Sequence, residues 1–280
     1  MQQLSLFDGV HETPPKIELA ELFEAYAKCR SNKRNTANAL AFEVDYEAKL
    51  LALCNEINNG SYQPDKSIAF IVTQPVKREI FAADFRDRVV HHLVVGKLNS
   101  IFERSFIHDN YACRAGKGAH FGIQRAERFI RRCSHNYTQD CYVLKLDIKG
   151  FFMHINKRIL IEKLKILIEH RYTFPDKTLL LELCEKIVNY EPTENCIVKS
   201  KRSQWDDLPK DKSLFHAQPD CGLPIGNLTS QVFANVYMNS FDHFIKHECG
   251  MRYYGRYVDD FILVHQDKEY LKALIPRIQR

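Results

Sequence analysis

Two adjacent aspartates, Asp259 and Asp260, stand between two short apolar runs near the C-terminal end of the sequence. The runs, Tyr253 to Val258 and Phe261 to Val264, are rich in aromatic and β-branched residues, which favours β-strands. We therefore expect the aspartates to lie at or beside the tight turn of a β-hairpin, where Asp is a favoured residue. Neighbouring carboxylates repel each other and raise each other's pKa unless a cation lies between them. The pattern predicts either an ordinary turn or a site for a hard divalent metal, Mg²⁺ or Mn²⁺, held by oxygen ligands.

The composition fits one large domain or two smaller ones. The chain has 280 residues, and 45% of them are hydrophobic, which is enough for sizeable cores. No apolar run approaches the ~20 residues of a membrane helix, and residues 1–8 lack the basic start and apolar core of a secretory signal. The nine cysteines include no CxxC pair, which favours a reducing compartment over a disulfide scaffold or a zinc site. We expect a cytoplasmic protein with no membrane partner.

The charge is more informative in its distribution than in its sum of +5. Several basic clusters carry aromatic neighbours such as Phe81, Phe121 and Phe129, and this mixture suits phosphates and stacked bases. Solvated helix faces have the same appearance, so each cluster alone leaves both interpretations open. The clusters are Lys28–Arg34, Lys77–Arg88, Arg114–Lys117, Arg125–Arg132, Lys157–Lys165 and Lys199–Lys212.

Hydrophobic periodicity predicts a mixture of helices and strands. Helices are expected as two segments within residues 16–58, the second ending at Asn58-Asn59-Gly60, and over residues 87–102, 120–133, 156–170, 177–189, 228–246 and from 268. Strands are expected over residues 67–73, 79–83, 142–148, 253–258 and 261–264. The polar stretch 191–220, which has three prolines, predicts a loop-rich excursion.

A third aspartate, Asp147, ends the strand expected over residues 142–148, with Val143 and Lys145 on the same face. A carboxylate at the end of an apolar strand is costly unless something compensates its charge. Two-metal phosphoryl transfer needs carboxylates from separate elements that converge on ions about 3.5–4 Å apart. One ion activates the attacking hydroxyl and the other holds the triphosphate and the leaving oxygen. We therefore expect Asp147, Asp259 and Asp260 to hold two Mg²⁺ or Mn²⁺ ions.

Five motifs, in the same order along the chain, resemble those of reverse transcriptases. They are Lys77–Ile80 with Phe85–Val90 (the first fingers motif of the bacterial enzymes), Tyr111–Gly118 (the second, usually G-F-R-P-G-R), Leu146–Phe152 (the first aspartate motif), Gly222–Gln231 (in the place of Q-G-x-x-x-S-P) and Tyr257–Asp260 (the palm hairpin). The resemblance implies an α+β right-hand polymerase fold of fingers and palm, with an antiparallel palm sheet packed on helices. It also implies RNA-directed DNA polymerase activity.

The fourth motif departs from most of the family, because Ile225 replaces Gln and Gln231 replaces Pro. The form I-G-x-x-x-S-Q is similar to that of diversity-generating retroelement reverse transcriptases. Those enzymes copy a template-repeat RNA with frequent errors opposite adenine, and the cDNA rewrites a variable target gene. The resemblance implies that Ile225 and Gly226 lie beside the incoming base pair, although Ile225 as ordinary core is an alternative. Ser230 and Gln231 are expected to pack or cap the helix near the template. Isoleucine offers only apolar contact where glutamine can hydrogen-bond, and losing a polar contact lowers discrimination.

The resemblance also assigns the metal ligands. Asp147 and Asp259 are expected to bind the ions directly, and the carbonyl of Ile148 to complete one coordination sphere. Asp260 is expected to support them, as an occasional ligand or by its charge.

Three further residues are expected to contact the nucleotide. Phe152 corresponds to the steric gate that excludes a ribose 2′-hydroxyl, with Phe151 as the rival and core packing as the alternative for either ring. Arg78 and Arg114 resemble fingers residues that hold the triphosphate, a task that suits a rigid, always-charged guanidinium. A salt bridge or an RNA-backbone contact is the alternative for each arginine.

The expected organisation is N-terminal helices and fingers over residues 1–140, palm over 141–165, a helical and loop insertion over 166–220, and palm over 221–280. Reverse transcriptases continue into a primer grip and a helical thumb, so we expect this chain, which ends at Arg280, to lack a thumb and to extend primers poorly. Implied partners are template RNA, primer and cDNA, deoxynucleoside triphosphates and a small basic accessory protein. The rivals are another bacterial reverse transcriptase, of retron, group II intron or phage-defence type, and a catalytically silent RNA-binding protein on the same fold.

Overall fold

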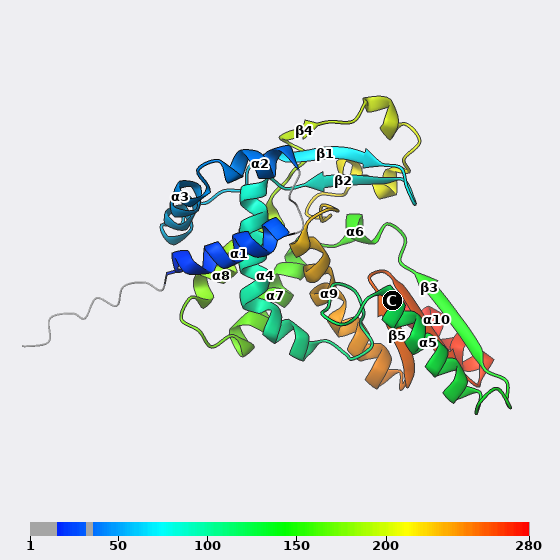
Figure 1. Ribbon diagram of the computed structural model, residues 1–280. Helices are drawn as coiled ribbons and strands as arrows, with labels where there is room; N and C mark the ends of the chain where they lie inside the picture. Colours follow the sequence, from blue (N-terminus) through cyan, green and yellow to red (C-terminus); the bar gives the residue numbers. More distant parts are fainter. Residues whose placement is uncertain (1–15, 32–35, 280) are drawn as a thin grey trace, which may run out of the picture.

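Two small sheets and a body of long helices make up the computed structural model, which describes residues 16–31 and 36–279 (Figure 1). Residues 1–8, considered above for a secretory signal, and the end of the first basic cluster at Lys33 and Arg34 lie outside the described residues. Within the described part of the chain, no helix is both long and apolar enough to cross a membrane.

The first sheet contains β1 (Ser67–Val72), β2 (Arg78–Ala82) and β4 (Cys196–Val198) in the order β2-β1-β4. β1 and β2 pair antiparallel and agree with the predicted strands, whereas β4 pairs parallel to β1 and was not predicted. A three-residue strand is too short to show an alternating pattern, which explains why residues 191–220 were predicted as a loop-rich excursion without a strand. Buried Glu79 fastens this excursion to β2, because it accepts hydrogen bonds from the side chains of Trp205 and Ser213.

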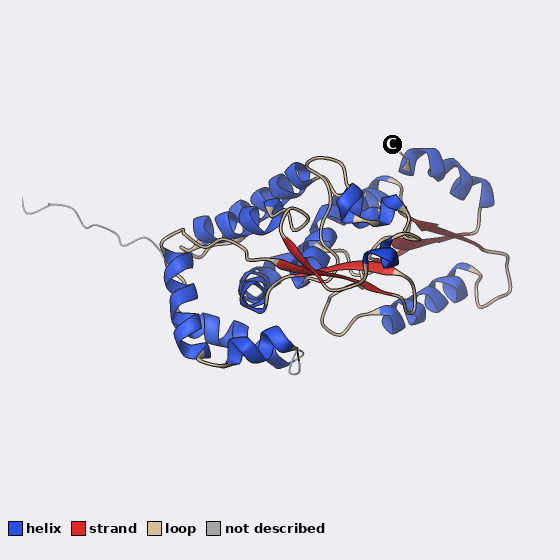
Figure 2. Cartoon of the chain, turned by 90° about the horizontal axis from the view of Figure 1, so that it is seen from above, coloured by secondary structure: helices blue, strands red, loops and turns tan. Residues whose placement is uncertain are grey.

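The second sheet contains β3 (Tyr142–Asp147), β5 (Tyr253–Tyr257) and β6 (Asp260–His265) in the order β3-β6-β5, all antiparallel. All three strands were predicted. Figure 2 shows this sheet between two helices, and the packing identifies them as α5 (Ala119–Cys133) and α10 (Lys268–Ile278).

The helical body forms around α4 (Phe85–Ser105), which runs through the centre of Figure 1. Its residues Val90, Leu93, Val94, Leu98 and Ile101 are buried as predicted. The other helices are α1 (Leu19–Ser31), α2 (Ala37–Glu43), α3 (Tyr46–Asn58), α6 (Phe151–His154), α7 (Lys157–Arg171), α8 (Lys177–Asn189) and α9 (Leu228–His243), which continues as a π-helical turn over Phe244–Glu248.

Local sequence signals set several helix ends. Asp84 begins α4 by accepting a hydrogen bond from the N–H of Arg86, and Asn156 begins α7 by accepting one from Ile159. After Asn59, Gly60 at φ +76° ends α3 as predicted. The prediction of two helices within residues 16–58 was wrong in number, because the described chain forms three.

The faces of β3 follow its predicted alternation. Leu144 and Leu146 pack toward the core of α9 and α10, whereas Val143, Lys145 and Asp147 are exposed. The expectation that Asp147 is at an energetically costly buried position is therefore wrong, since its carboxylate lies at the surface. A surface position at the end of a strand leaves this carboxylate free to bind a ligand from solution.

Candidate metal centre

Asp147, Asp259 and Asp260 meet at one end of the second sheet. Asp147 is the last residue of β3, and the strand register places it directly opposite Asp260, the first residue of β6. Asp259 lies in the turn before β6, and its carbonyl accepts a hydrogen bond of 3.3 Å from the N–H of Ile148. One carboxylate oxygen from each aspartate lies within 4.8 Å of the others. Convergence of the three predicted carboxylates is thus a property of the fold.

The turn between β5 and β6 contains only Val258 and Asp259, because Tyr257 pairs with Asp260. Val258 has a φ of +59°, in the left-handed region that a β-branched residue rarely adopts. Such strain persists only where the surroundings enforce it, and it concentrates at functional sites. The strained residue comes directly before the carboxylate of Asp259.

The electrostatics of the cluster favour a cation. Partial burial raises the pKa of Asp259, the charges of Asp147 and Asp260 raise it further, and the charge of Arg78 lowers it. Lys145 supplies part of the compensation, since its Nζ lies 3.0 Å from Oδ1 of Asp260. Three carboxylates within reach of one another are the oxygen donors that Mg²⁺ and Mn²⁺ prefer. The residues present therefore fit a divalent metal.

The carbonyl of Ile148 is the remaining predicted ligand. It accepts a hydrogen bond of 3.2 Å from the N–H of Phe151. A carbonyl oxygen has a second lone pair, so this contact leaves ligation open, and the role of Ile148 stays a prediction.

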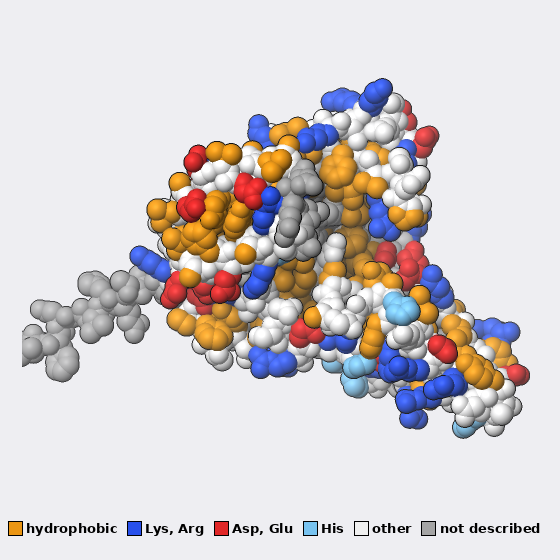
Figure 3. Space-filling view, viewed as in Figure 1, with side chains coloured by type: hydrophobic (Ala, Val, Ile, Leu, Met, Phe, Trp, Pro, Cys, Tyr) orange, Lys and Arg blue, Asp and Glu red, His pale blue; other side chains and the backbone are white. Residues whose placement is uncertain are grey.

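The charge of Arg78 acts on the cluster, whereas Arg114 is engaged by other groups. Arg78 begins β2 as an exposed residue, and its charge acts on Asp259. In Figure 3 acidic side chains gather in the recess between the parts of the molecule that carry the two sheets, with basic side chains beside them. The guanidinium of Arg114 is instead engaged by Glu103, at 2.8 Å, and by the carbonyls of Ile107 and Asn110. These local contacts match the salt-bridge alternative, and triphosphate binding by Arg114 stays a prediction.

The two phenylalanines after Asp147 have different surroundings. The strand ends in a turn at Gly150, with φ +61°, and both rings lie on α6, a short helix that was not predicted. Phe151 is buried in the main core, whereas Phe152 is partly exposed. Of the two rings, Phe152 is therefore the more accessible, and its role as a steric gate stays a prediction.

The turn that carries Ile225 is attached to the first sheet. The N–H of Phe81 donates to the carbonyl of Ile225 at 2.9 Å, and the amide of Asn227 bonds both Ala83 N–H and the Phe81 carbonyl. Gly226 has a φ of +123°, and a Cβ there would meet Cγ2 of Ile80 at 2.7 Å. Glycine is thus required by both conformation and space. The side chain of Ile225 is half-buried and packs in an apolar cluster shared with Phe152.

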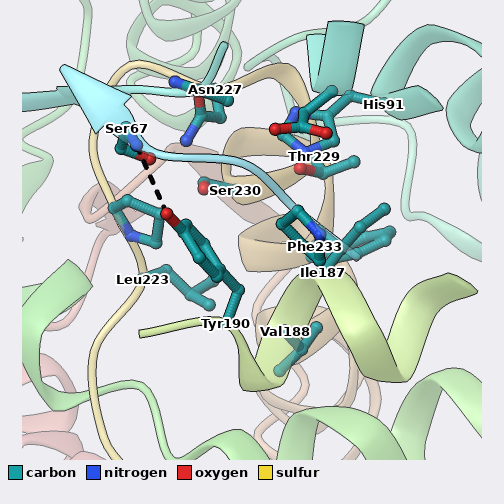
Figure 4. Close-up of a pocket in the computed structure, with 14 residues that line it drawn as sticks. Ser67, His91, Ile187, Val188, Tyr190, Leu223, Asn227, Thr229, Ser230 and Phe233 are labelled. Carbon is teal, nitrogen blue, oxygen red and sulfur yellow. Dashed lines mark hydrogen bonds between the residues drawn. The ribbon is translucent and has the colours of Figure 1, made fainter. Parts of the chain in front are cut away.

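Ser230 and Gln231 point to different environments on α9. Ser230 is buried and lines a cavity of about 20 Å³, room for one water molecule, together with His91, Thr229 and Asn227 (Figure 4). Gln231 is exposed, and its Oε1 accepts a bond of 2.6 Å from Sγ of Cys113 in the loop 111–118. Ser230 therefore packs between the helices, whereas Gln231 is exposed, and contact of either residue with a template stays a prediction.

Lys145 and Asn227 are two residues near the candidate site that the sequence did not single out. Lys145 carried a usable signal, since the alternation of β3 placed it on the face of Asp147. Asn227 carried a misleading one, because an Asn before a helix predicts a cap, whereas its amide here bonds the backbone of β2 and the segment after it.

The chain resembles known proteins in sequence and in fold. Residues 76–280 match the sequence profile of the family described as Reverse transcriptase (RNA-dependent DNA polymerase). The protein named Nuclear intron maturase 1, mitochondrial, from Arabidopsis thaliana is 24% identical over 205 residues, which cover 64% of this chain and 28% of that protein.

Two solved structures of apo telomerase from Candida tropicalis superimpose on the chain with a TM-score of 0.52. The one truncated from the C-terminal domain is 15% identical and covers 81% of this chain and 50% of its own. The other is 14% identical and covers 78% and 42% respectively. At these identities the likeness shows the fold alone. The chain spans less than a third of the curated relative and half or less of the two structures.

Proposed function

The chain belongs to the reverse transcriptase (RNA-dependent DNA polymerase) family, and on that premise we propose that it extends a primer along an RNA template with deoxynucleoside triphosphates. The convergence of Asp147, Asp259 and Asp260 within 4.8 Å supports this proposal most strongly. The exposed guanidinium of Arg78, whose charge lowers the pKa of Asp259, adds a group that can bind a triphosphate.

Each carboxylate has its own part in the proposed reaction. Asp147 and Asp259 would hold two Mg²⁺ or Mn²⁺ ions, with the Ile148 carbonyl as a further ligand, and Asp260 would support them. When bound, the ions lower the pKa of the primer 3′-hydroxyl and stabilise the charge that develops on the leaving pyrophosphate. Arg78 holds the triphosphate in line with the primer, and Arg114 remains a second candidate for that task.

The nucleotide itself is selected by apolar contacts. The ring of Phe152 excludes a 2′-hydroxyl, and Ile225 with Gly226 lies beside the incoming base pair. Ser230 and Gln231 support the helix near the template. Because Ile225 cannot hydrogen-bond the nucleotide, mispaired nucleotides are rejected less strongly.

We further propose that the enzyme is of the diversity-generating retroelement type, working with a template-repeat RNA and a small basic accessory protein. Ile225 and Gln231, in the motif Ile-Gly-x-x-x-Ser-Gln, support this assignment. The likeness to a protein named as an intron maturase keeps an enzyme of intron type as the second candidate. The error spectrum separates them, since excess misincorporation opposite template adenine is expected of the first type and uniform, accurate copying of the second.

Primer extension on an RNA template tests the activity. The protein is incubated with a labelled DNA primer annealed to RNA, deoxynucleoside triphosphates and Mg²⁺, and Asp259→Asn is compared with Asp207→Asn, a control at an exposed aspartate that pairs with Lys77. We expect slow but measurable extension by the wild type and the control, and none by Asp259→Asn, with equal RNA binding by fluorescence anisotropy. Extension by Asp259→Asn at the wild-type rate would refute the proposed role of the cluster. RNA binding without extension by any variant would support the silent RNA-binding protein.

A further inference from the structure

Arg256 is a buried cation next to the candidate metal centre. It lies on β5, its side chain has 0% exposure, and it is the largest fully buried side chain in the described part of the chain. A buried guanidinium is very unfavourable unless it is paired and its N–H groups are hydrogen-bonded. The identity of its partners therefore decides what this residue does.

Two of its nitrogens are fixed by α9. Nε and Nη2 of Arg256 each donate to one carboxylate oxygen of Asp242 at 2.7 Å, which is the two-pronged geometry of a strong pair. Tyr254 donates to the same carboxylate at 2.6 Å, and Asp242 is itself fully buried. The guanidinium plane is thus held in one orientation.

The third nitrogen of the guanidinium contacts the turn formed by Val258 and Asp259. Nη1 of Arg256 donates to the carbonyl of Val258 at 2.7 Å and also lies 3.3 Å from Oδ1 of Asn235. Val258 is the turn residue at φ +59°, and its carbonyl belongs to the peptide that joins it to Asp259. A bond to this oxygen fixes the orientation of that peptide, and hence the direction in which Asp259 leaves the turn.

Further hydrogen bonds hold the backbone of Arg256 and the side chain of Asn235. The N–H of Arg256 donates to the carbonyl of Asp109 at 2.9 Å, and its carbonyl accepts from the N–H of Tyr111 at 3.0 Å. Asn235 in turn donates to the carbonyl of Ala112 at 2.8 Å. The strained turn is therefore braced from α9 and from the loop that precedes α5, and Arg256 is the residue that joins both to it.

We propose that Arg256 is a positioning residue for the metal centre: its Nη1–H bond to the Val258 carbonyl holds the strained turn in the conformation that aims Asp259 at Asp147 and Asp260. The inference rests on the proposed metal-dependent polymerase function. It differs from a purely structural ion pair, which would affect unfolding alone, because one donor is committed to the turn and not to Asp242.

Arg256→Lys tests the proposal with the charge retained. A lysine ammonium can pair with Asp242 but lacks the planar fork that spans Asp242 and Val258 together. We expect the Mg²⁺ concentration for half-maximal primer extension to rise at least tenfold and kcat to fall about 100-fold, while KM for the nucleotide changes less than threefold. Mn²⁺ affinity, measured by calorimetry without substrate, is expected to fall about tenfold. Arg30→Lys, in a similar two-pronged pair with Glu43, is the matched control and leaves these quantities unchanged.

A second variant covers the case in which Arg256→Lys does not fold. Asp242→Leu with Arg256→Met replaces the buried pair by apolar residues, an exchange that often preserves or improves stability. This folded protein has no donor for the Val258 carbonyl, so the same losses of Mn²⁺ affinity and extension are expected. Wild-type Mn²⁺ affinity and Mg²⁺ requirement in either folded variant would overturn the proposal. Failure of the wild type itself to extend a primer would refute the proposed function instead, and the Mn²⁺ measurement would still decide the role of Arg256.

Discussion

Asp147 and Asp260 are directly opposed residues of two hydrogen-bonded strands. Like charges directly opposite each other on a sheet are destabilising. Lys145 lies diagonally across the same strand pair and contacts Asp260 at 3.0 Å, so a cation from the chain itself already occupies part of the site. The three side chains together act as a preformed acidic site that is partly neutralised from within.

Lys145→Met is expected to bind Mn²⁺ more tightly than the wild type. The ammonium competes with a metal for Asp260, and this exposed pair is screened by solvent, so removing it predicts a gain in affinity of only about two- to fivefold. Calorimetric titration with Mn²⁺ measures this. Lys149→Met, which removes an exposed lysine paired with Asp211 at 3.1 Å, is the control. Weaker Mn²⁺ binding by Lys145→Met would show that Lys145 assists the metal and does not compete with it.

Phe152→Ala is expected to admit ribonucleotides. Removing the partly exposed ring opens space for a 2′-hydroxyl, so the ratio of kcat/KM for deoxy- over ribonucleotide should fall about 100-fold in single-nucleotide extension. Phe151→Ala is the control. Its ring is buried, so its loss is expected to lower the free energy of unfolding by about 3–5 kcal/mol and to leave the sugar selectivity unchanged. Unchanged sugar selectivity in Phe152→Ala would remove this residue from the nucleotide site.

Ile225→Gln is expected to copy more accurately. A glutamine at this position adds a hydrogen bond to the correctly placed nucleotide, and a bond of about 1 kcal/mol lowers the error frequency roughly fivefold. Sequencing of cDNA made from an RNA of known sequence measures errors opposite adenine. Ile225→Leu, which stays apolar, is expected to retain the wild-type errors. An equal error frequency in Ile225→Gln and the wild type would mean that this side chain acts only in the apolar cluster with Phe152.

The free energy of unfolding of His91→Phe is expected to fall less in acid than that of the wild type. Burial, and then the charges of His92 and Arg88, lowers the pKa of His91 from 6.5 to about 3. The unfolded chain therefore takes up a proton between pH 6.5 and 3 that the folded protein does not, so this stability is present above pH 6.5 and is lost as the pH falls. At pH 5 the loss attributable to His91 is about 2 kcal/mol.

Urea unfolding at pH 7 and pH 5 measures the effect, and the wild type should lose about 2 kcal/mol more than the variant. Asp87 lines the same cavity and has the opposite effect, because burial raises its pKa to about 6 and favours the folded state when it is protonated. That contribution is common to both proteins and cancels in the comparison. Identical pH dependence of the two proteins would contradict the lowered pKa of His91.

The sequence predicts local elements of this fold better than the contacts between them. The strands around Asp147 and Asp259 follow from alternation and turn chemistry, and α8 was predicted at its observed bounds. The pairing of Arg256 with Asp242 joins a strand to a helix and leaves no periodic signal. The parallel pairing of β4 depends on a contact between residues far apart in the chain.

In the candidate site too, local features were predictable from the sequence and long-range contacts were not. The convergence of the three aspartates was predictable, because the hypothesis of a two-metal site calls for carboxylates from separate elements. The different surroundings of Arg78 and Arg114 were not, since both are arginines in basic motifs and only the fold places Arg114 against Glu103. The attachment of the Ile225 turn to β2 likewise depends on backbone hydrogen bonds that no side-chain pattern encodes.

Binding of Mn²⁺ to the cluster tests the central claim most directly. Electron paramagnetic resonance counts the free ion in the presence of the wild type, Asp147→Asn, Asp259→Asn and the control Asp207→Asn. We predict that each of the first two substitutions lowers the affinity at least tenfold, because each removes one of three converging carboxylates, and that the control binds as the wild type does. Equal Mn²⁺ binding by all four proteins would contradict the assignment of Asp147, Asp259 and Asp260 as the metal centre.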